Sequence, residues 1–371
     1  MTDRPSRRRR LPRDVRQALR RPARTTVWLV ASLVGVFLLQ LKVDALTSVL
    51  AMIRLGANVP PLVWAGEWWR LVSANFLHGS ALHIAFNGWA LWVLGGLLER
   101  MLDGRRLLLL YLVSALGGAL ASTLFSGALL AVGASTAVFG LLGGLAAVQW
   151  RLGPAMPDVF RQSRRWWWLV LGINGAISFL VPNVDAAAHV GGFAAGGLLG
   201  LVLVGPRRPL MARTDHPGVL GALFAMLAVF GFGLGQAYLG AVGFDDGASA
   251  RALRAVAAHD EAPPEVLNEL AWTLALDKRA GRQTLEAAAQ TAQVAVDRAE
   301  AEGSPSDHVR DTLATVQSRL GEPQAAGATE LGALVEAPRP FYATQLGRFL
   351  VGAPKPAWLE GAPQARPGGQ R

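Results

Sequence analysis

Seven apolar stretches, each close to the length that crosses a lipid bilayer, constrain this chain more than any other feature. They lie at residues 26–41, 82–98, 107–130, 135–150, 166–181, 187–204 and 219–240. A transmembrane helix needs about 20 apolar residues. Several of the stretches are short and rich in glycine, which favours helices that pack against other helices. Charged residues make up only 17% of the chain, so a soluble globule of this size would lack polar surface. We predict an all-α protein that crosses the membrane several times.

The arginines indicate how these stretches are oriented. Residues 1–24 hold ten arginines and no apolar periodicity, and we expect a disordered cytoplasmic tail there. The loops after the second, fourth and sixth stretches carry three or four arginines each, whereas the loops after the third and fifth carry none. Because positively charged loops stay in the cytoplasm, the N-terminus is expected inside and the chain beyond residue 240 outside. The net charge of +10 then reflects membrane topology, and we expect no nucleic-acid partner.

The chain beyond residue 240 has a different composition. It is rich in Ala, Leu and Glu, and 17 acidic residues outnumber 13 basic ones. Helical spacing is found at residues 266–276, 285–301, 308–320 and 324–335. Matched alanine spacing in two helix pairs resembles tetratricopeptide repeats, although about three repeats are normally needed for a stable stack. The absence of cysteine excludes disulfides and cysteine–zinc sites.

Polar side chains within membrane spans are costly, so they indicate function. With the N-terminus inside, the second, fourth and sixth stretches all begin at the outer face. His83 and Asn87 lie near the start of the second, Ser135 opens the fourth and His189 opens the sixth. Neutral imidazole is the usual base that activates a serine near neutral pH. His83 and Asn87 are four residues apart and share a helix face, where they could donate to an oxyanion.

Each of these features also has an ordinary explanation when taken alone. A serine in a span usually bonds to its own helix, and a histidine at the end of a span is usually an interfacial residue. Glycines spaced by four, as at residues 140, 144, 192, 196 and 200, indicate close helix packing. Only their occurrence at one depth of the membrane favours a catalytic site.

These residues resemble the motifs of the rhomboid intramembrane serine proteases. The matching segments are GASTAVFG at 133–140, AHVGG at 188–192, HGS at 78–80 leading to His83 and Asn87, and the pairs Trp69-Arg70 and Glu99-Arg100. The resemblance covers about residues 26–204 and implies a six-helix core with a water-filled site open to the outside. It implies that Ser135 is the nucleophile and His189 the base, without a required carboxylate. His83 and Asn87 would contribute to the oxyanion hole, and His78, Gly133 and Phe139 would support the site.

Two residues near these motifs need their own interpretation. Thr136 stands where the family usually has the second glycine of Gly-x-Ser-Gly, and its β-branched side chain could crowd substrate or a neighbouring helix. Asp185, four residues before His189, is interpreted as a helix N-cap rather than a third catalytic group.

The predicted organisation has five parts. They are a basic cytoplasmic tail at 1–24, a six-helix rhomboid-like membrane core at 25–206, a seventh transmembrane helix at 217–240, a soluble tetratricopeptide-like helical domain at 250–350 and a flexible Pro/Gly-rich tail at 351–371. We predict a multi-pass protein of the cell membrane whose C-terminal domain is extracytoplasmic.

The predicted activity is that of a serine endopeptidase without a cofactor or metal, which hydrolyses peptide bonds in or near transmembrane segments of membrane proteins. Its predicted partners are these substrates, the bilayer, and a peptide or protein bound by the C-terminal domain. The alternative is an inactive rhomboid-like protein that binds transmembrane helices or acts as a scaffold. A transporter would require paired charges within the spans, and the sequence has none deep inside them.

Overall fold

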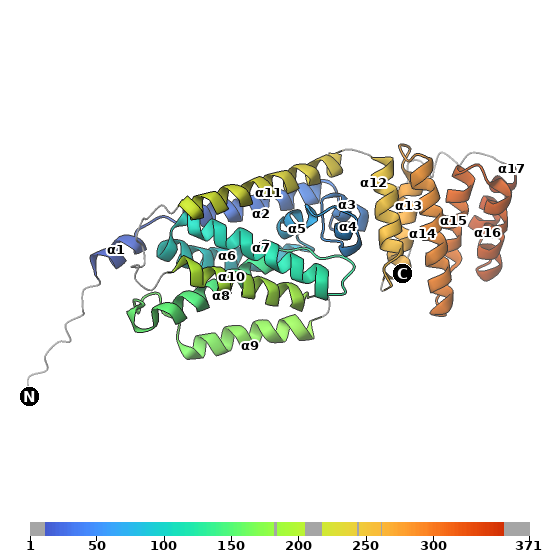
Figure 1. The fold of residues 1–371 in the computed structure, drawn as a ribbon. Coiled ribbons are helices and arrows are strands. Elements are labelled where there is room, and N and C mark those ends of the chain that lie inside the picture. The colour runs from blue at the N-terminus through green and yellow to red at the C-terminus, as the bar shows by residue number, and fades with distance from the viewer. Residues whose placement is uncertain (1–11, 182–183, 205–216, 243–244, 261, 352–371) are drawn as a thin grey trace, which may run out of the picture. The chain divides into compact units, whose positions relative to one another are not determined.

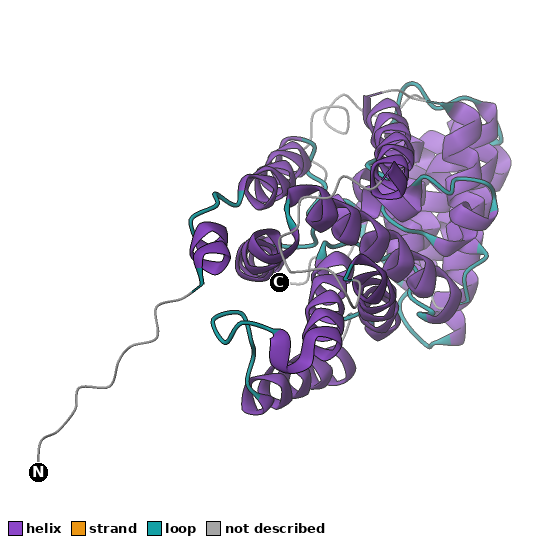
Figure 2. Cartoon of the chain, turned by 60° about the vertical axis from the view of Figure 1, so that its left-hand side comes forward, coloured by secondary structure: helices purple, strands orange, loops and turns teal. Residues whose placement is uncertain are grey.

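A computed structural model describes residues 12–181, 184–204, 217–242, 245–260 and 262–351 of the chain. Every regular element in these ranges is a helix (Figure 2), and the β pairing found there is an isolated bridge between Asn58 and Ala131. The all-α prediction is therefore confirmed for the described residues. The arginines of the predicted loop at 205–216 and most of the predicted tail at 351–371 lie outside them.

The chain forms two compact units. Residues 1–39, 71–126 and 132–233 make up one, here called the membrane unit, and residues 40–70, 127–131 and 234–371 make up the other, the C-terminal unit. This division differs from the predicted domain boundaries. The connections at 40–70 and 127–131 belong with the C-terminal helices rather than with the membrane helices between which they stand in the sequence.

The membrane unit consists of long apolar helices joined by short elements (Figure 1). In chain order they are α1 (Arg13–Leu19), α2 (Arg24–Lys42), α5 (Arg70–Ser73), a 3-10 turn (Ala74–Phe76), α6 (Ala81–Leu102), α7 (Gly104–Phe125), α8 (Ser135–Leu152), a second 3-10 turn (Gly153–Ala155), α9 (Arg164–Leu180), α10 (Ala186–Leu203) and α11 (Pro217–Val242). α2 and α11 extend a few residues into the C-terminal unit.

Five helical segments among the described residues are long and apolar enough to cross a membrane. They are Val15–Lys42, Ala81–Leu102, Gly104–Phe125, Ala186–Leu203 and Gly218–Gln236. The predicted spans at 135–150 and 166–181 also form helices, α8 and α9, but these are not among the five. The chain is a multi-pass membrane protein. The third span ends earlier than predicted: α7 stops at Phe125. Gly127, just beyond it, has a positive φ of 69°, which a helix does not contain.

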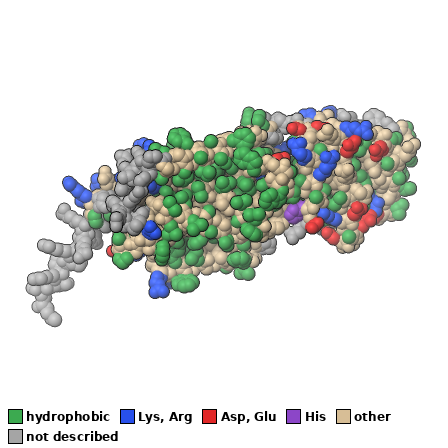
Figure 3. Space-filling view, in the orientation of Figure 1, with side chains coloured by type: hydrophobic (Ala, Val, Ile, Leu, Met, Phe, Trp, Pro, Cys, Tyr) green, Lys and Arg blue, Asp and Glu red, His purple; other side chains and the backbone are tan. Residues whose placement is uncertain are grey.

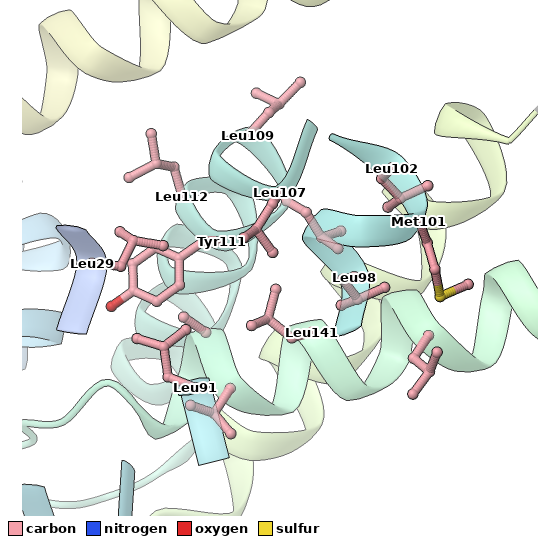
Figure 4. Close-up of a cluster of buried hydrophobic side chains, with 14 of the residues drawn as sticks. Leu29, Leu91, Leu98, Met101, Leu102, Leu107, Leu109, Tyr111, Leu112 and Leu141 are labelled. Carbon is pink, nitrogen blue, oxygen red and sulfur yellow. The ribbon is translucent and has the colours of Figure 1, made fainter. Parts of the chain in front are cut away.

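The core of the membrane unit is an apolar cluster to which α2, α6, α7 and α8 contribute many leucines. Leu91, Leu98, Leu107 and Leu141 are fully buried (Figure 4). α8 lies against α7 and α10, and the approach to α10 is close enough to require glycine. A Cβ built on Gly196 would lie 2.0 Å from the carbonyl oxygen of Gly140. The predicted role of the glycine-rich faces in close helix packing is therefore confirmed.

The first helices are held to this core by specific contacts. The carboxylate of Glu99, near the end of α6, accepts hydrogen bonds from the backbone N–H groups of Thr25 and Thr26 at 2.9 Å each. Residues 13–19 were expected to be disordered, and this expectation is wrong. They form α1, whose Val15 and Ala18 are buried in contact with the membrane helices. Two apolar residues three positions apart are too short a pattern to reveal a helix from sequence.

Hydrophobic side chains cover much of the membrane unit's visible face, whereas charged side chains gather on the C-terminal helices (Figure 3). α9 is a clear example of such an exposed apolar surface, since the side chains of Trp168 and Phe179 are 76% and 74% exposed. One side chain of α9, that of Ser178, is buried. A soluble protein rarely exposes such a large apolar surface, so this composition fits helices that face lipid.

In the C-terminal unit, helices that follow one another in the chain pack against each other. Its elements are α3 (Val49–Arg54), α4 (Pro60–Trp64), α12 (Asp246–Ala257), α13 (Pro264–Leu276), α14 (Arg282–Ala301), α15 (Asp307–Arg319), α16 (Pro323–Glu336) and α17 (Pro340–Val351). The four predicted helices correspond to α13–α16 within a few residues. α12 and α17 were not predicted from the sequence. Each successive pair of helices from α13 to α17 is in contact.

The connection between α2 and α6 packs on this helical series. Leu50, Ile53 and Leu62 of α3 and α4 share one buried core with residues of α12–α15. The backbone N–H of Val49 donates to the Glu269 carboxylate at 3.1 Å. Arg70 fastens the connection internally, because its guanidinium donates to the Ile53 carbonyl at 2.6 Å and to the Ala57 carbonyl.

Candidate active site

Ser135 is the first residue of α8, and the turn before it requires glycine. Gly133 has a φ of 135°, which a residue with a Cβ rarely adopts. A Cβ at this position would also lie 2.7 Å from the His83 ring. The Gly133 N–H donates to the Ala74 carbonyl at 3.0 Å. This turn therefore fixes the start of α8 next to the ring of His83.

His189 lies in the first turn of α10 and faces Ser135. Its Nε2 atom is 3.0 Å from the Ser135 hydroxyl, a hydrogen-bond distance. The ring of Phe139, one helical turn after Ser135, stacks on the imidazole with centroids 3.9 Å apart and planes 9° apart. The structure thus brings together the serine and the histidine that the sequence predicts at one depth, with Phe139 stacked on the histidine ring.

Asp185 starts α10 as its N-cap, which confirms the interpretation from sequence. Its Oδ1 atom accepts the backbone N–H of Ala188 at 2.8 Å. Its Oδ2 atom accepts the hydroxyl of Ser122, from α7, at 2.5 Å. Both carboxylate oxygens are therefore engaged in holding the start of α10. The carboxylate acts on the position of His189 through the helix.

His83 and Asn87 project from one face of α6, as their spacing predicts. The hydroxyl of Ser80 caps this helix by accepting the backbone N–H of His83 at 3.1 Å. Asn87 is buried, and its Nδ2 atom has no hydrogen-bond partner among the residues that the structure describes. His78 is fully buried, with its ring centroid 5.1 Å from that of His83. A buried amide donor without a partner is costly unless a ligand or intermediate uses it.

Thr136 packs closely against the neighbouring helix α7, where a glycine, Gly118, leaves room for it. Its side chain is buried against α7, where a Cβ on Gly118 would lie 2.7 Å from it. Its hydroxyl donates to the side-chain oxygen of Asn75, whose amide in turn donates to the Leu71 carbonyl at 2.7 Å. Thr136 therefore ties the start of α8 to the 3-10 turn at residues 74–76.

Sequence reasoning missed three residues of this neighbourhood. They are Asn75 and Gly118, which accommodate Thr136, and Ser178 of α9, whose hydroxyl lies 2.6 Å from Nδ1 of His189. Ser178 could have been noticed in the sequence as a polar residue within an apolar stretch. Its partner could not be read from the sequence, because the orientation of α9 depends on contacts between helices.

The part of the chain that contains Ser135, His189 and Phe139 matches a known protein family. Residues 65–206 match the Rhomboid domain. All seven residues predicted for the site lie inside this Rhomboid domain. The match ends at residue 206, so the tetratricopeptide-like character of the C-terminal helices stays a prediction.

Relatives of the Rhomboid domain occur in plants and bacteria. RHOMBOID-like protein 4 from Arabidopsis thaliana is 35% identical over 195 residues, covering 48% of this chain and 48% of that protein. Rhomboid protease GluP from Bacillus subtilis is 33% identical over 197 residues, covering 50% of this chain and 36% of GluP. Rhomboid protease GlpG from Serratia proteamaculans is 39% identical over 139 residues, covering 36% and 47%. The chain spans about half the length of these relatives or less. No solved structure matches the chain.

Proposed function

We propose that this protein is an intramembrane serine endopeptidase that hydrolyses peptide bonds in or near transmembrane segments of membrane proteins. The observation that carries the proposal is the 3.0 Å contact between the Ser135 hydroxyl and Nε2 of His189 inside the Rhomboid domain. Two of the relatives are named as rhomboid proteases, which supports the same reaction class.

In the proposed reaction, Ser135 is the nucleophile and His189 the general base. Nε2 of His189 takes the hydroxyl proton while the Ser135 oxygen bonds to the carbonyl carbon of the scissile peptide. The tetrahedral intermediate collapses, the C–N bond breaks, and the leaving amine takes the proton from Nε2. Water then attacks the acyl-enzyme with His189 again as base, which releases the carboxylate product and restores Ser135. Phe139 keeps the ring in the orientation that both transfers need.

The oxyanion of that intermediate would be stabilised by donors already in place. Ser135 is the first residue of α8, so its backbone N–H has no partner in the helix. The Asn87 amide, on α6, is buried without a partner among the described residues. With the ring of His83, these groups form the proposed oxyanion hole. Preorganised donors of this kind typically contribute the largest single term in such catalysis.

The packing of Thr136 argues against the inactive, helix-binding alternative. Its side chain faces α7 and Asn75, so it does not occupy the space between the serine and the oxyanion donors. No chemical group needed for acyl transfer is lost by the substitution of glycine by threonine at this position.

We further propose that the N-terminus is cytoplasmic and that the C-terminal helices are extracytoplasmic, in a cell membrane. Two connections of the C-terminal unit, at 40–70 and 127–131, lead along the chain into α6 and α8, whose first turns carry His83 and Ser135. The arginine-rich loops lie at the opposite ends of these helices. This supports a six-helix core with α11 as a seventh span, and helices α12–α17 as a tetratricopeptide-like module that binds a peptide or protein partner.

Cleavage of a tagged single-span substrate in proteoliposomes tests the activity. Wild-type protein should cleave it and should be labelled by a fluorophosphonate probe, whereas Ser135→Ala should do neither and His189→Ala should lose cleavage. Cleavage by the Ser135→Ala variant at the wild-type rate would refute the nucleophile. A wild-type protein that neither cleaves nor is labelled would instead favour the helix-binding alternative.

A further inference from the structure

We propose that Ser178 is a positioning residue for His189, which holds the imidazole in the tautomer that can act as a base. This inference rests on the proposed protease activity and adds a third member to the Ser135–His189 pair. The Ser178 hydroxyl lies 2.6 Å from Nδ1 of His189 and 2.7 Å from the backbone carbonyl of Asn174.

The single proton of the Ser178 hydroxyl decides the direction of these bonds. The Asn174 carbonyl can only accept, so at 2.7 Å the hydroxyl must donate to it. The lone pairs of the hydroxyl oxygen then face Nδ1, which can bond to them only if it carries a proton. Neutral imidazole has one N–H, so Nε2 is left as the acceptor for the Ser135 hydroxyl at 3.0 Å. The chain of bonds therefore runs in one direction, from Ser135 through His189 and Ser178 to Asn174.

The burial of Ser178 distinguishes this arrangement from ordinary back-bonding of a serine to its own helix. Such back-bonding needs no contact with another helix, and it explains the bond to Asn174 alone. Ser178 is 6% exposed, while its neighbours Ile177 and Phe179 are 44% and 74% exposed. Among the side chains of α9, which the structure describes in full, only that of Ser178 is buried. A largely lipid-facing helix thus turns one polar group toward the base.

Two contacts together define the orientation of the ring. Phe139 stacks on its face, and Ser178 accepts from its edge. The face contact alone leaves the ring free to make a half-turn about its bond to Cβ, which would put carbon atoms where Nδ1 and Nε2 now lie, because the stacked surface is nearly the same in both positions. The acceptor at Nδ1 removes that freedom. When His189 takes the proton of Ser135, the bond from Nδ1 to Ser178 persists and stabilises the cation, as an acidic partner would do more strongly.

Replacement of Ser178 by alanine and by threonine tests the proposal. Ser178→Ala removes the acceptor, and we expect kcat for a single-span substrate to fall about tenfold, because the charged ring of the transition state loses more from the missing bond than the neutral ring does, with KM unchanged. Because the protonated ring loses a partner, the acid limb of the pH–rate profile should move to lower pH. Ser178→Thr keeps a hydroxyl that can bond to the carbonyl four residues earlier and should restore most of the rate. The other titratable groups near the ring, Asp185 and His83, are unchanged in both variants.

Ser114→Ala is the matched control. Ser114 is a fully buried serine of α7 whose hydroxyl donates to the carbonyl of Leu110, four residues earlier, at 2.6 Å, and we expect its loss to leave kcat and the pH profile unchanged. Rates are expressed per folded molecule, with the folded fraction taken from thermal unfolding of each variant.

The outcomes separate this inference from the activity on which it rests. Cleavage by wild type together with an unchanged kcat and pH profile in Ser178→Ala overturns the role of Ser178 alone. A rate in Ser178→Thr as low as in Ser178→Ala also overturns it, because the hydroxyl would then not be the group that matters. Absence of both cleavage and fluorophosphonate labelling in wild type overturns the protease proposal, and the role of Ser178 with it.

Discussion

The contact between α8 and α10 yields a prediction in which two adjacent glycines behave differently. A Cβ added at Gly196 would lie 2.0 Å from the Gly140 carbonyl oxygen and 2.5 Å from the carbonyl carbon. A Cβ added at Gly197 would lie 3.7 Å from its nearest neighbour, the carbonyl oxygen of Gly143. Both substitutions Gly→Ala change helix propensity equally, since they lie in the middle of the same helix. Any difference between them therefore measures the helix contact.

The geometry sets the size of the effect at Gly196. Ordinary contacts of a Cβ begin at 3.4 Å, so α8 and α10 would have to separate by about 1.4 Å in a close-packed interior. Overpacking of this kind costs about 1–3 kcal/mol of folding stability. We expect a cost near the upper end of this range, because the added Cβ meets backbone atoms of Gly140, which cannot rotate away as a side chain can. The separation also acts on the 3.0 Å contact between Ser135 and His189, where a misplacement of about 1 Å can cost 100-fold in rate.

Two assays on the purified protein in detergent or proteoliposomes check this prediction. Thermal unfolding should show Gly196→Ala destabilised by about 2–3 kcal/mol, and Gly197→Ala unchanged or more stable by up to about 1 kcal/mol. Substrate cleavage should fall at least about 100-fold in Gly196→Ala and stay near wild type in Gly197→Ala. Equal stability and activity in the two variants would refute the close contact between the helices.

Three further predictions concern other contacts of the structure. Asn87→Ala should lower kcat about 100- to 1,000-fold with little change in KM, as measured by steady-state cleavage, and an unchanged kcat would remove Asn87 from the oxyanion hole. Thr136→Val keeps the shape of the side chain but loses the bond to Asn75, so thermal unfolding should show a loss of about 1 kcal/mol, and unchanged stability would contradict a role for this bond. In the C-terminal unit, hydrogen bonding from Thr284 holds the pKa of Asp246 below its ordinary value. The contribution of the Asp246 carboxylate to stability is therefore present above about pH 4 and is lost as the pH falls through the lowered pKa. Unfolding of the full chain between pH 6 and pH 2, followed by helix content, should be less pH-dependent in Asp246→Asn than in wild type.

Much of the fold could be predicted because its signals are local. In lipid a spanning segment must satisfy its backbone hydrogen bonds within itself, so each apolar stretch had to be a helix, and all seven are. The cap of α10 by Asp185 is equally local, since its partner Ala188 is three residues away. The prediction was wrong where the pattern was short, as in α1, and it placed the end of α7 five residues too late.

For the site, the residues alone predict only which polar side chains lie at the same depth in the membrane. Alternating arginine-rich loops predict that the starts of α6, α8 and α10 lie at one face, so His83, Asn87, Ser135 and His189 could be grouped without a structure. Neither the rotation of each helix nor the distance between them follows from loop charges. The 3.0 Å contact of Ser135 with His189 depends on glycines that let α8 and α10 approach at the backbone.

Tertiary structure alone decided which further residues belong to this site. It also decided that the segments at 40–70 and 127–131 belong to the C-terminal unit. Ser178 bonds to His189 and Asn75 to Thr136 across 11 and 61 residues, and the connection at 40–70 joins helices that begin beyond residue 245. Such contacts are determined by how whole helices pack, which depends on many side chains at once. Hydropathy and loop charge therefore determine that this chain forms membrane helices and at which depth its polar groups lie, whereas the partners of those groups are determined only when the helices pack together.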